Sequence, residues 1–277
     1  MILKFMPDNH KYVSLNQEDL TEWISVTSFI GNFKKPFEAD IIAEKSSKNK
    51  KSKWYGMKVE DIKNAWKNEA NRATTLGSWY HTKQEKGYCE LNTICRKNKE
   101  VSIVKPIEID GIKYSPNQKL EDGVYPEHLV YLKSSGICGQ SDLVEVINGE
   151  VHITDYKTNK EIKTEGFKNW DGSVNKMLPP LSHLDDCNLT HYTLQLSLYM
   201  YMILKHNPKL KPGQLTIHHI HFETVGEDKF GNPITALDSN GDPIVKDVVP
   251  YTLSYLKPEV ISLLHWLEDN RKKLKVY

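Results

Sequence analysis

The chain has 277 residues, of which 39% are hydrophobic and 26% are charged, and its formal net charge is +1 at pH 7. This length is enough for one large domain or a core with a small lobe, and the composition is that of a soluble globular protein, which excludes a disordered chain. The small net charge excludes an overall basic field, so any surface for nucleic acid must be local.

The cysteines and the apolar runs predict the compartment. Cys89, Cys95, Cys138 and Cys187 form no CxxC pair, which argues against a zinc ribbon, and their scattered use is typical of a reducing compartment. No apolar run reaches membrane-spanning length, and the first residues lack the pattern of a secretory signal. We therefore expect a protein without a membrane partner, in the cytoplasm of a bacterium or of a phage-infected host.

The N-terminal part is expected to hold short elements. Residues 2–5 and 11–15 are predicted strands around a Pro-Asp-Asn turn at 7–9, Ser25 is a candidate N-cap, and Pro36 is expected to open a helix over 37–44.

A lysine-rich stretch at residues 45–53 runs into Trp54 and Tyr55. Clustered lysines beside aromatic rings can hold a phosphate backbone and stack a base. A solvated, flexible linker has the same composition. Both interpretations stay open at this point.

Two helices are predicted next, over residues 58–73 and 78–93, with Gly77 as the break between them. His81 and Glu85 are four residues apart in the second of these helices, so they share one face and can reach the same object. Pairs of this kind are also common on helix surfaces.

Strands follow over residues 101–103, 107–109 and 126–132, and they lead into a hairpin at 137–157. Asn148-Gly149 is the strongest short-range signal for a two-residue hairpin turn, and it determines which residues lie opposite each other. Carried down the ladder, this register puts Asp142 opposite Asp155.

Residues two apart share a strand face, so Lys157 and Gln140 are expected beside the two aspartates. Two like charges directly opposite each other destabilise a sheet, and a divalent cation with oxygen ligands removes the repulsion. Two carboxylates, a metal ion and an ammonium group form a plausible site for phosphodiester hydrolysis. The alternative is that these are ordinary solvated strand residues.

The remaining chain is predicted to continue with a long irregular segment at 159–188 and a helix over Leu189–His206 that carries Gln195 and Tyr199 on one stripe. A strand is expected over 214–225. On it, His219 and His221 share a face and suit a metal ion, but they suit an ordinary strand as well. A hairpin excursion, a strand over 248–256 and a helix opened by Pro258 complete the prediction.

Four motifs occur in order along the chain: Gly77-x3-His81-x3-Glu85, Gly139-x2-Asp142, Asp155-x-Lys157-Thr158 and Gln195-x3-Tyr199. Together they resemble the RecB-type nucleases of the PD-(D/E)XK superfamily, and the chain is also similar to the mitochondrial genome maintenance exonuclease and to phage exonucleases of that branch. Each motif alone is common, whereas the ordered set over residues 77–199 is specific.

The resemblance implies an α/β fold of the α+β mixed-sheet kind: a restriction-endonuclease-like core with a central antiparallel hairpin flanked by helices. We expect residues 1–57 to form an N-terminal lobe or DNA-binding extension and residues 58–277 to form the nuclease core. Within that core, 159–188 would be a flexible flap and 226–247 the hairpin excursion.

The resemblance also implies the metal ligands. Asp142 and Asp155 would bind Mg²⁺ or Mn²⁺, with His81 and the backbone carbonyl of Tyr156 completing the coordination. Glu127 is a secondary candidate for the acidic side of the site.

Other residues would act on the substrate or on the water. Lys157 would orient the attacking water and stabilise negative charge, while Gln195 and Tyr199 would position the substrate or Lys157. Glu85 would support the site without touching the metal ion.

Two features that some relatives in this superfamily carry are missing from the sequence. No cysteine follows Cys187, so we expect no iron–sulfur cluster, and no GxxxxGK[ST] phosphate loop is present, so a helicase or recombination partner would be a separate chain.

The function implied is metal-dependent hydrolysis of DNA, by an exonuclease in recombination, repair or replication that acts on single strands or free ends. The alternatives are a catalytically inactive nuclease-like DNA-binding module and an RNA-directed nuclease.

Overall fold

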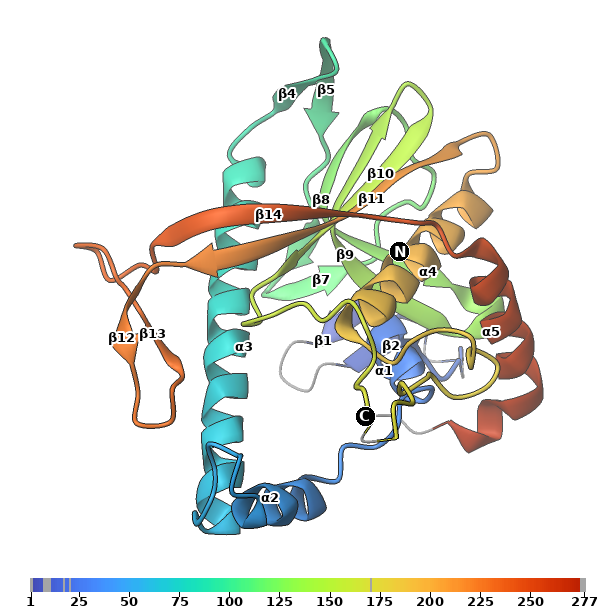
Figure 1. The fold of residues 1–277 in the computed structure, drawn as a ribbon. Coiled ribbons are helices and arrows are strands. Elements are labelled where there is room, and N and C mark those ends of the chain that lie inside the picture. Colours follow the sequence, from blue (N-terminus) through green and yellow to red (C-terminus); the bar gives the residue numbers. More distant parts are fainter. Residues whose placement is uncertain (1, 7–10, 17, 20, 170, 275–277) are drawn as a thin grey trace.

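A mixed sheet lies at the centre of the molecule, with helices on both of its faces (Figure 1). The computed structural model describes residues 2–6, 11–16, 18–19, 21–169 and 171–274. The strands are β1 (Leu3–Met6), β2 (Lys11–Ser14), β3 (Ile24–Ser25), β4 (Thr93–Arg96), β5 (Lys99–Ile103), β6 (Ile107–Ile109), β7 (Ile112–Tyr114), β8 (Gly123–Leu132), β9 (Ile137–Ile147), β10 (Glu150–Lys157), β11 (Lys211–Phe222), β12 (Thr224–Glu227), β13 (Pro233–Thr235) and β14 (Val245–Leu253). The helices are α1 (Val26–Gly31), α2 (Ala39–Lys48), α3 (Val59–Cys89), α4 (Asn188–His206) and α5 (Lys257–Asn270), with short 3₁₀ turns η2 (Lys133–Ser135) and η3 (Arg271–Lys273).

Eight strands of the described chain form the main sheet, in the order β14-β11-β10-β9-β8-β5-β4, with β3 added beside β9. The pairs β8–β9 and β9–β10 are antiparallel, whereas β10 and β11 run parallel. A smaller sheet has the order β2-β1-β7-β6. The predicted α/β fold with a mixed sheet and a central antiparallel hairpin is therefore confirmed.

The hairpin turn sets the centre of this sheet. Asn148 has φ +54° and Gly149 has φ +77°, so both turn residues are left-handed, as a type I′ turn requires. The predicted register is confirmed from Ile147 opposite Glu150 to Leu143 opposite Thr154.

The ladder between β9 and β10 ends one pair earlier than predicted. Asp142 and Asp155 would be next, but the Asp142 carboxylate instead accepts a hydrogen bond from the Tyr156 N–H at 2.7 Å. A side chain thus takes the backbone donor that a regular strand partner would have used. The expectation that Asp142 and Asp155 form a regular cross-strand pair is wrong for this reason.

Successive side chains of β9 and β10 point to opposite faces of the sheet, so they belong to two separate apolar clusters. Val144 and Val151 belong to the large core with Leu194 and other residues of α4, whereas Leu143 packs with Tyr88 of α3. α4 and α3 therefore cover opposite faces of the sheet.

One continuous helix, α3, replaces the two helices predicted around Gly77. Glycine disfavours a helix interior by only about 1 kcal/mol relative to alanine, which tertiary contacts can offset. Thr158, at the end of β10, approaches closely here: a Cβ built on Gly77 would lie 3.2 Å from its Oγ1, and that hydroxyl donates a hydrogen bond to the Ala73 carbonyl at 3.0 Å. Gly77 therefore lets a strand end approach the helix.

The lysine-rich stretch is not a free linker. α2 continues to Lys48, and Trp54 is buried, with its ring 6.3 Å from that of Trp66 and 6.0 Å from that of Phe230. Because these rings cover it, Trp54 does not offer the open stacking face that the nucleic-acid-binding interpretation requires.

The segment at 159–188, apart from residue 170, is irregular but anchored. Ile162, Met177 and Leu181 are buried in the large core, and the Leu178 N–H donates to the Phe33 carbonyl at 2.8 Å. Whether it moves as a flap stays a prediction.

The predicted N-terminal turn at residues 7–9 lies outside the described residues.

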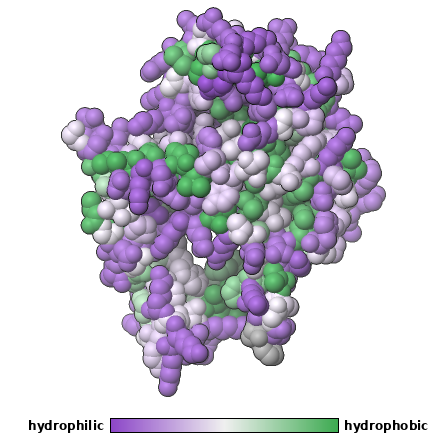
Figure 2. Space-filling model, turned by 45° about the horizontal axis from the view of Figure 1, so that its top comes forward, coloured by the Kyte–Doolittle hydropathy of each residue, from purple (hydrophilic) through white to green (hydrophobic). Residues whose placement is uncertain are grey.

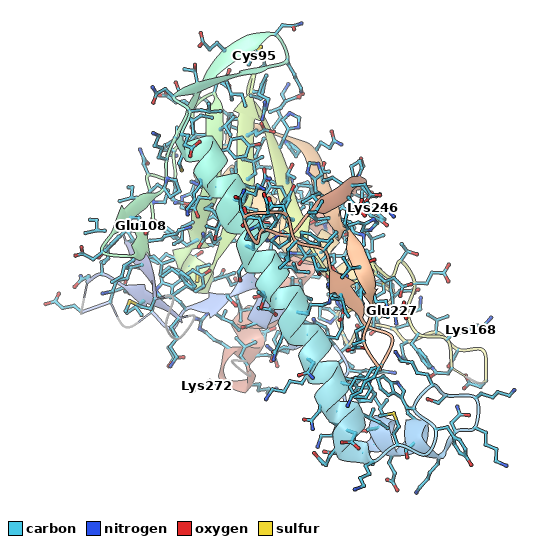
Figure 3. All side chains as sticks on the ribbon, turned by 90° about the vertical axis from the view of Figure 1, so that its left-hand side faces the viewer. Cys95, Glu108, Lys168, Glu227, Lys246 and Lys272 are labelled. Carbon is cyan, nitrogen blue, oxygen red and sulfur yellow. The ribbon has the colours of Figure 1, made fainter. Side chains whose placement is uncertain are left out.

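Two further views show where the hairpins and the polar residues lie. Figure 3 shows Cys95 of the β4–β5 hairpin near one end of α3, with Glu227 of β12 and Lys246 of β14 on the side of the β12–β14 excursion. Polar residues cover much of the face in Figure 2, and apolar residues lie among them in separate groups. None of the described helices has the length and apolar character needed to cross a membrane.

Candidate active site

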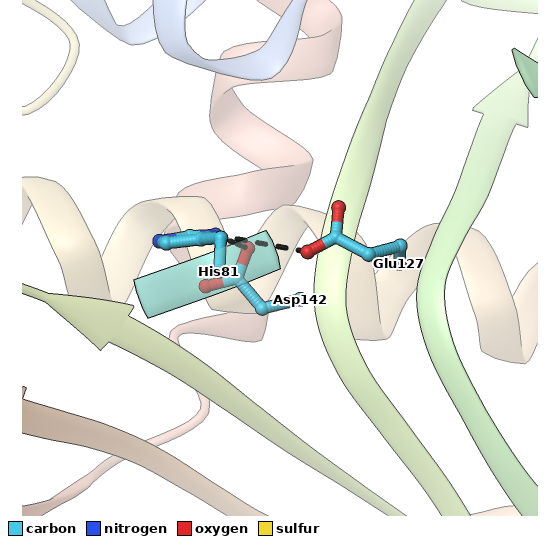
Figure 4. Close-up of side chains that lie close together, drawn as sticks. All are labelled: His81, Glu127 and Asp142. Carbon is cyan, nitrogen blue, oxygen red and sulfur yellow. Dashed lines mark ion pairs between the residues drawn. The ribbon is translucent and has the colours of Figure 1, made fainter. Parts of the chain in front are cut away.

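Three side chains of the types that can bind a metal ion converge in an open cleft: His81 of α3, Glu127 of β8 and Asp142 of β9 (Figure 4). Their ligand atoms all lie within 4.8 Å of one another. His81 Nδ1 is 3.3 Å from Asp142 Oδ1 and 3.7 Å from Glu127 Oε1. The cleft has a volume of about 560 Å³, and these three residues line it together with Gly77 and Glu85. One imidazole and two carboxylates form a donor set that fits a divalent cation.

Helix α3 brings His81 to the sheet. Gly77 and His81 are one helical turn apart, so the close contact of Gly77 with Thr158 fixes how the His81 face approaches β10. The His81 Nε2 atom lies 3.3 Å from the Tyr156 carbonyl oxygen. His81 thus contacts Asp142 through one ring nitrogen and the Tyr156 carbonyl through the other. Whether this carbonyl is a metal ligand stays a prediction.

Glu127 reaches the cleft through an unusual backbone conformation. In β8, Pro126 pairs with Leu143 and His128 pairs with Ser141, but Glu127 itself is skipped and has φ +49°. A left-handed conformation at a non-glycine residue costs free energy of order 1 kcal/mol or more, and such strain is concentrated at functional sites. The left-handed backbone at Glu127 turns its side chain toward Asp142. No residue nearby in the sequence indicates this conformation.

Asp155 is turned toward a second group of residues. It is 1% exposed, its Oδ1 accepts a hydrogen bond from Gln195 Nε2 at 3.2 Å, and its Oδ2 forms an ion pair with Lys157. Gln195 Nε2 also lies 3.4 Å from the Tyr199 hydroxyl. Asp155 is thus held by Lys157 and α4, next to the group of three.

The charges in the site favour a bound cation. Burial lowers the pKa of His81, but Asp142 and Glu127 raise it more, to about 11. Burial and the nearby Asp142 charge raise the pKa of Asp155 to about 6, against the effect of Lys157. Burial lowers the pKa of Lys157, but Asp155 and Asp142 raise it more, so this ammonium stays charged. The carboxylates therefore stabilise positive charge at the point where they meet.

The glycine of the second motif is explained by α4. A Cβ built on Gly139 would lie 2.6 Å from Tyr199 Cε1, which is closer than non-bonded carbon atoms approach. Gly139 thus admits the Tyr199 ring against β9, and Tyr199 in turn contacts Gln195.

Charged and polar side chains lie around Glu127. Lys113 Nζ lies 2.7 Å from Glu85 Oε1 and 3.8 Å from Glu127 Oε2, and Gln140 Nε2 donates a hydrogen bond to Glu127. Glu85 is therefore linked to the cleft through Lys113. Nothing near Lys113 in the sequence distinguishes it from other strand lysines, so its place beside the cleft could not be predicted.

Comparison with known proteins gives one match. The model of the PD-(D/E)XK nuclease superfamily matches residues 47–249 of the chain. This span contains every residue of the cleft described above and continues into β14. No curated protein and no solved structure matches the chain. The mixed sheet with helices on both faces is consistent with the fold of that superfamily.

Proposed function

The chain belongs to the PD-(D/E)XK nuclease superfamily, which makes it a candidate metal-dependent nuclease, and we propose that it is a DNA exonuclease of the RecB-type branch. The observation that carries the proposal is the convergence of His81, Glu127 and Asp142 in an open cleft beside the Asp155–Lys157 pair.

The donor set supports a Mg²⁺ or Mn²⁺ site. We assign His81, Glu127 and Asp142 as ligands, with Asp142 as the central one. The Tyr156 carbonyl, which lies 3.3 Å from the other ring nitrogen of His81, is proposed as a further ligand on the strength of the resemblance. Asp155 remains a proposed ligand as well, because it precedes Tyr156, whose backbone N–H and carbonyl contact Asp142 and His81. The imidazole nitrogen favours Mn²⁺ somewhat over Mg²⁺, since it is a softer donor than a carboxylate.

The residues around the ion have separate tasks. A divalent cation bound here would lower the pKa of a water molecule and neutralise charge on the phosphate. Lys157 stays protonated, so its ammonium orients the attacking water and stabilises negative charge as the phosphodiester reacts. Gln195 holds Asp155, and Tyr199 packs against Gly139 behind Gln195, so α4 keeps the Asp155 carboxylate in place.

Digestion of end-labelled DNA tests this function. Purified protein is incubated with single- and double-stranded DNA whose ends are free, blocked or closed into circles, with Mg²⁺ or Mn²⁺ and with or without EDTA. We expect metal-dependent loss of linear DNA with free ends, and no loss of circles. Binding without digestion would favour the inactive DNA-binding module, and digestion of RNA instead of DNA would favour an RNA-directed nuclease.

A further inference from the structure

Two histidines of β11 face each other outside the acidic cleft. His219 and His221 are two residues apart on one strand and therefore point to the same face. His219 Nδ1 lies 3.0 Å from His221 Nε2, and the ring centroids are 4.3 Å apart at an angle of 83°. His219 is 3% exposed, whereas the His221 side chain is 38% exposed.

The outer nitrogen of each ring has a partner that only accepts hydrogen bonds. His219 Nε2 lies 2.6 Å from the Asn159 carbonyl oxygen, and His221 Nδ1 lies 2.6 Å from Asp247 Oδ1. A carbonyl oxygen and a carboxylate accept but cannot donate, so both outer nitrogens must carry a hydrogen.

This arrangement determines the state of the two inner nitrogens. A neutral imidazole carries one hydrogen, which is already on the outer nitrogen of each ring. His219 Nδ1 and His221 Nε2 are then both lone pairs, and two lone pairs at 3.0 Å repel each other unless a cation lies between them. The cation is either a third proton or a metal ion.

We propose that His219 and His221 bind a late first-row transition-metal ion, with Zn²⁺ as the representative case, through these two inner nitrogens. Zn–N distances are about 2.0–2.1 Å, so one ion can bond to both nitrogens across the observed gap. Metal-bound histidines almost always donate the other ring N–H to a carboxylate or a backbone carbonyl, and Asp247 and Asn159 provide one of each. Water completes the coordination on the exposed side of His221.

The donor chemistry separates this site from the acidic cleft. Imidazole nitrogens suit zinc, copper and nickel, whereas carboxylates, carbonyls and water suit magnesium and manganese. Among the described residues, the one group of three possible metal ligands consists of His81, Glu127 and Asp142 in the cleft. The β11 pair is not part of that group and is therefore a separate site with two histidines. It lies at the β11–β14 edge of the sheet, and Lys246, labelled in Figure 3, precedes Asp247 on β14.

The site is connected to the segment that follows Lys157. His219 is the strand partner of Lys157 in the parallel β10–β11 ladder. The hydrogen bond between His219 and the Asn159 carbonyl holds the chain two residues after Lys157. An ion on His219 therefore fixes the start of the irregular segment beside the proposed active site.

Equilibrium dialysis with Zn²⁺ in the presence of excess Mg²⁺ tests the proposal. The wild-type protein is compared with His221→Gln and His219→Gln, and with His218→Gln as a matched control on the opposite face of β11. We expect both variants of the pair to lose one equivalent of bound zinc per chain, and the control to keep it. Equal zinc in the wild type and in His221→Gln, whose exposed side chain is easily replaced, would show that only a proton lies between the rings.

Two further measurements separate this site from the cleft. Asp247→Asn is expected to weaken zinc binding by about tenfold, the usual effect of changing the partner of a metal-bound histidine. His81→Gln should keep the β11 zinc, and Cu²⁺ bound to that variant should show coupling to two nitrogens in its electron paramagnetic resonance spectrum. Loss of the zinc in His81→Gln, with retention in His221→Gln, would overturn the assignment.

Discussion

The Asp142 carboxylate accepts a hydrogen bond from the Tyr156 N–H at 2.7 Å, at the point where β9 and β10 stop pairing. This bond holds one oxygen of Asp142, while the other faces His81 at 3.3 Å. The same side chain thus ends a strand ladder and opens the acidic cleft.

Asp142→Asn is therefore expected to keep the fold and lose activity. The asparagine oxygen can still accept the Tyr156 N–H, but the side chain no longer carries the charge that a cation needs. We expect turnover of labelled DNA to fall by about 100-fold or more. Asp110→Asn, in the exposed β6–β7 turn, is the matched control and should retain full turnover. Equal rates for the two variants would remove Asp142 from the mechanism.

Lys157→Met is expected to lower the rate more than the affinity for DNA, because Lys157 acts on the reacting groups. It should also destabilise the protein by about 3 kcal/mol, since the Asp155 charge is then buried without its partner. Adding Asp155→Asn should restore part of the stability but none of the activity. Urea unfolding measures the first effect, and a Lys157→Met protein as stable as the wild type would contradict it.

Gly139→Ala is predicted to destabilise the protein by about 1–3 kcal/mol, because the new Cβ overlaps the Tyr199 ring. Gly87→Ala on α3 is the control. A Cβ there meets nothing within 4 Å, so this helix position should gain up to about 1 kcal/mol. Thermal unfolding of both variants checks the sign. A stable Gly139→Ala protein would mean that α4 does not need the close approach.

The stability of the protein should depend on pH through His128. Burial lowers the pKa of this histidine from 6.5 to about 4, and its Nε2 has no hydrogen-bond partner among the described residues. Between these two values the unfolded chain binds more protons than the folded one, so the contribution is present above pH 6.5 and is lost as the pH falls toward 4. Integrating this difference gives a loss of about 2 kcal/mol between pH 7 and pH 5.

The variant His128→Gln isolates that effect. Its free energy of unfolding should fall less than that of the wild type between pH 7 and pH 5. His183→Gln, which changes an exposed histidine, should follow the wild-type pH profile. Parallel profiles for the wild type and His128→Gln would show that His128 does not cause the loss.

Much of the central hairpin could be predicted, because its determinants are local. Asn148 and Gly149 both adopt the left-handed conformation that this turn requires, and the turn then sets the pairing as far as Leu143 and Thr154. On α3, β10 and α4, helix and strand periods determine only which side chains share a face of the same element. That these faces meet at one site was expected from the resemblance to the nuclease superfamily.

The remaining features depend on contacts between distant segments. Gly77 was predicted to break the helix, but it lies inside α3, where the absence of a side chain lets Thr158 approach closely. Glu127 enters the cleft because its backbone is left-handed within β8, which no neighbouring residue indicates. The end of the ladder at Asp142 depends on one side-chain hydrogen bond, which propensity and pattern do not encode.

The most direct test of the proposed metal site is calorimetric titration of Mn²⁺ into the wild-type protein and into Glu127→Gln and Asp142→Asn. If the acidic cleft holds the catalytic ion, the wild type binds Mn²⁺, Glu127→Gln binds it more weakly, and Asp142→Asn loses the binding. Unchanged Mn²⁺ affinity in both variants would contradict the account.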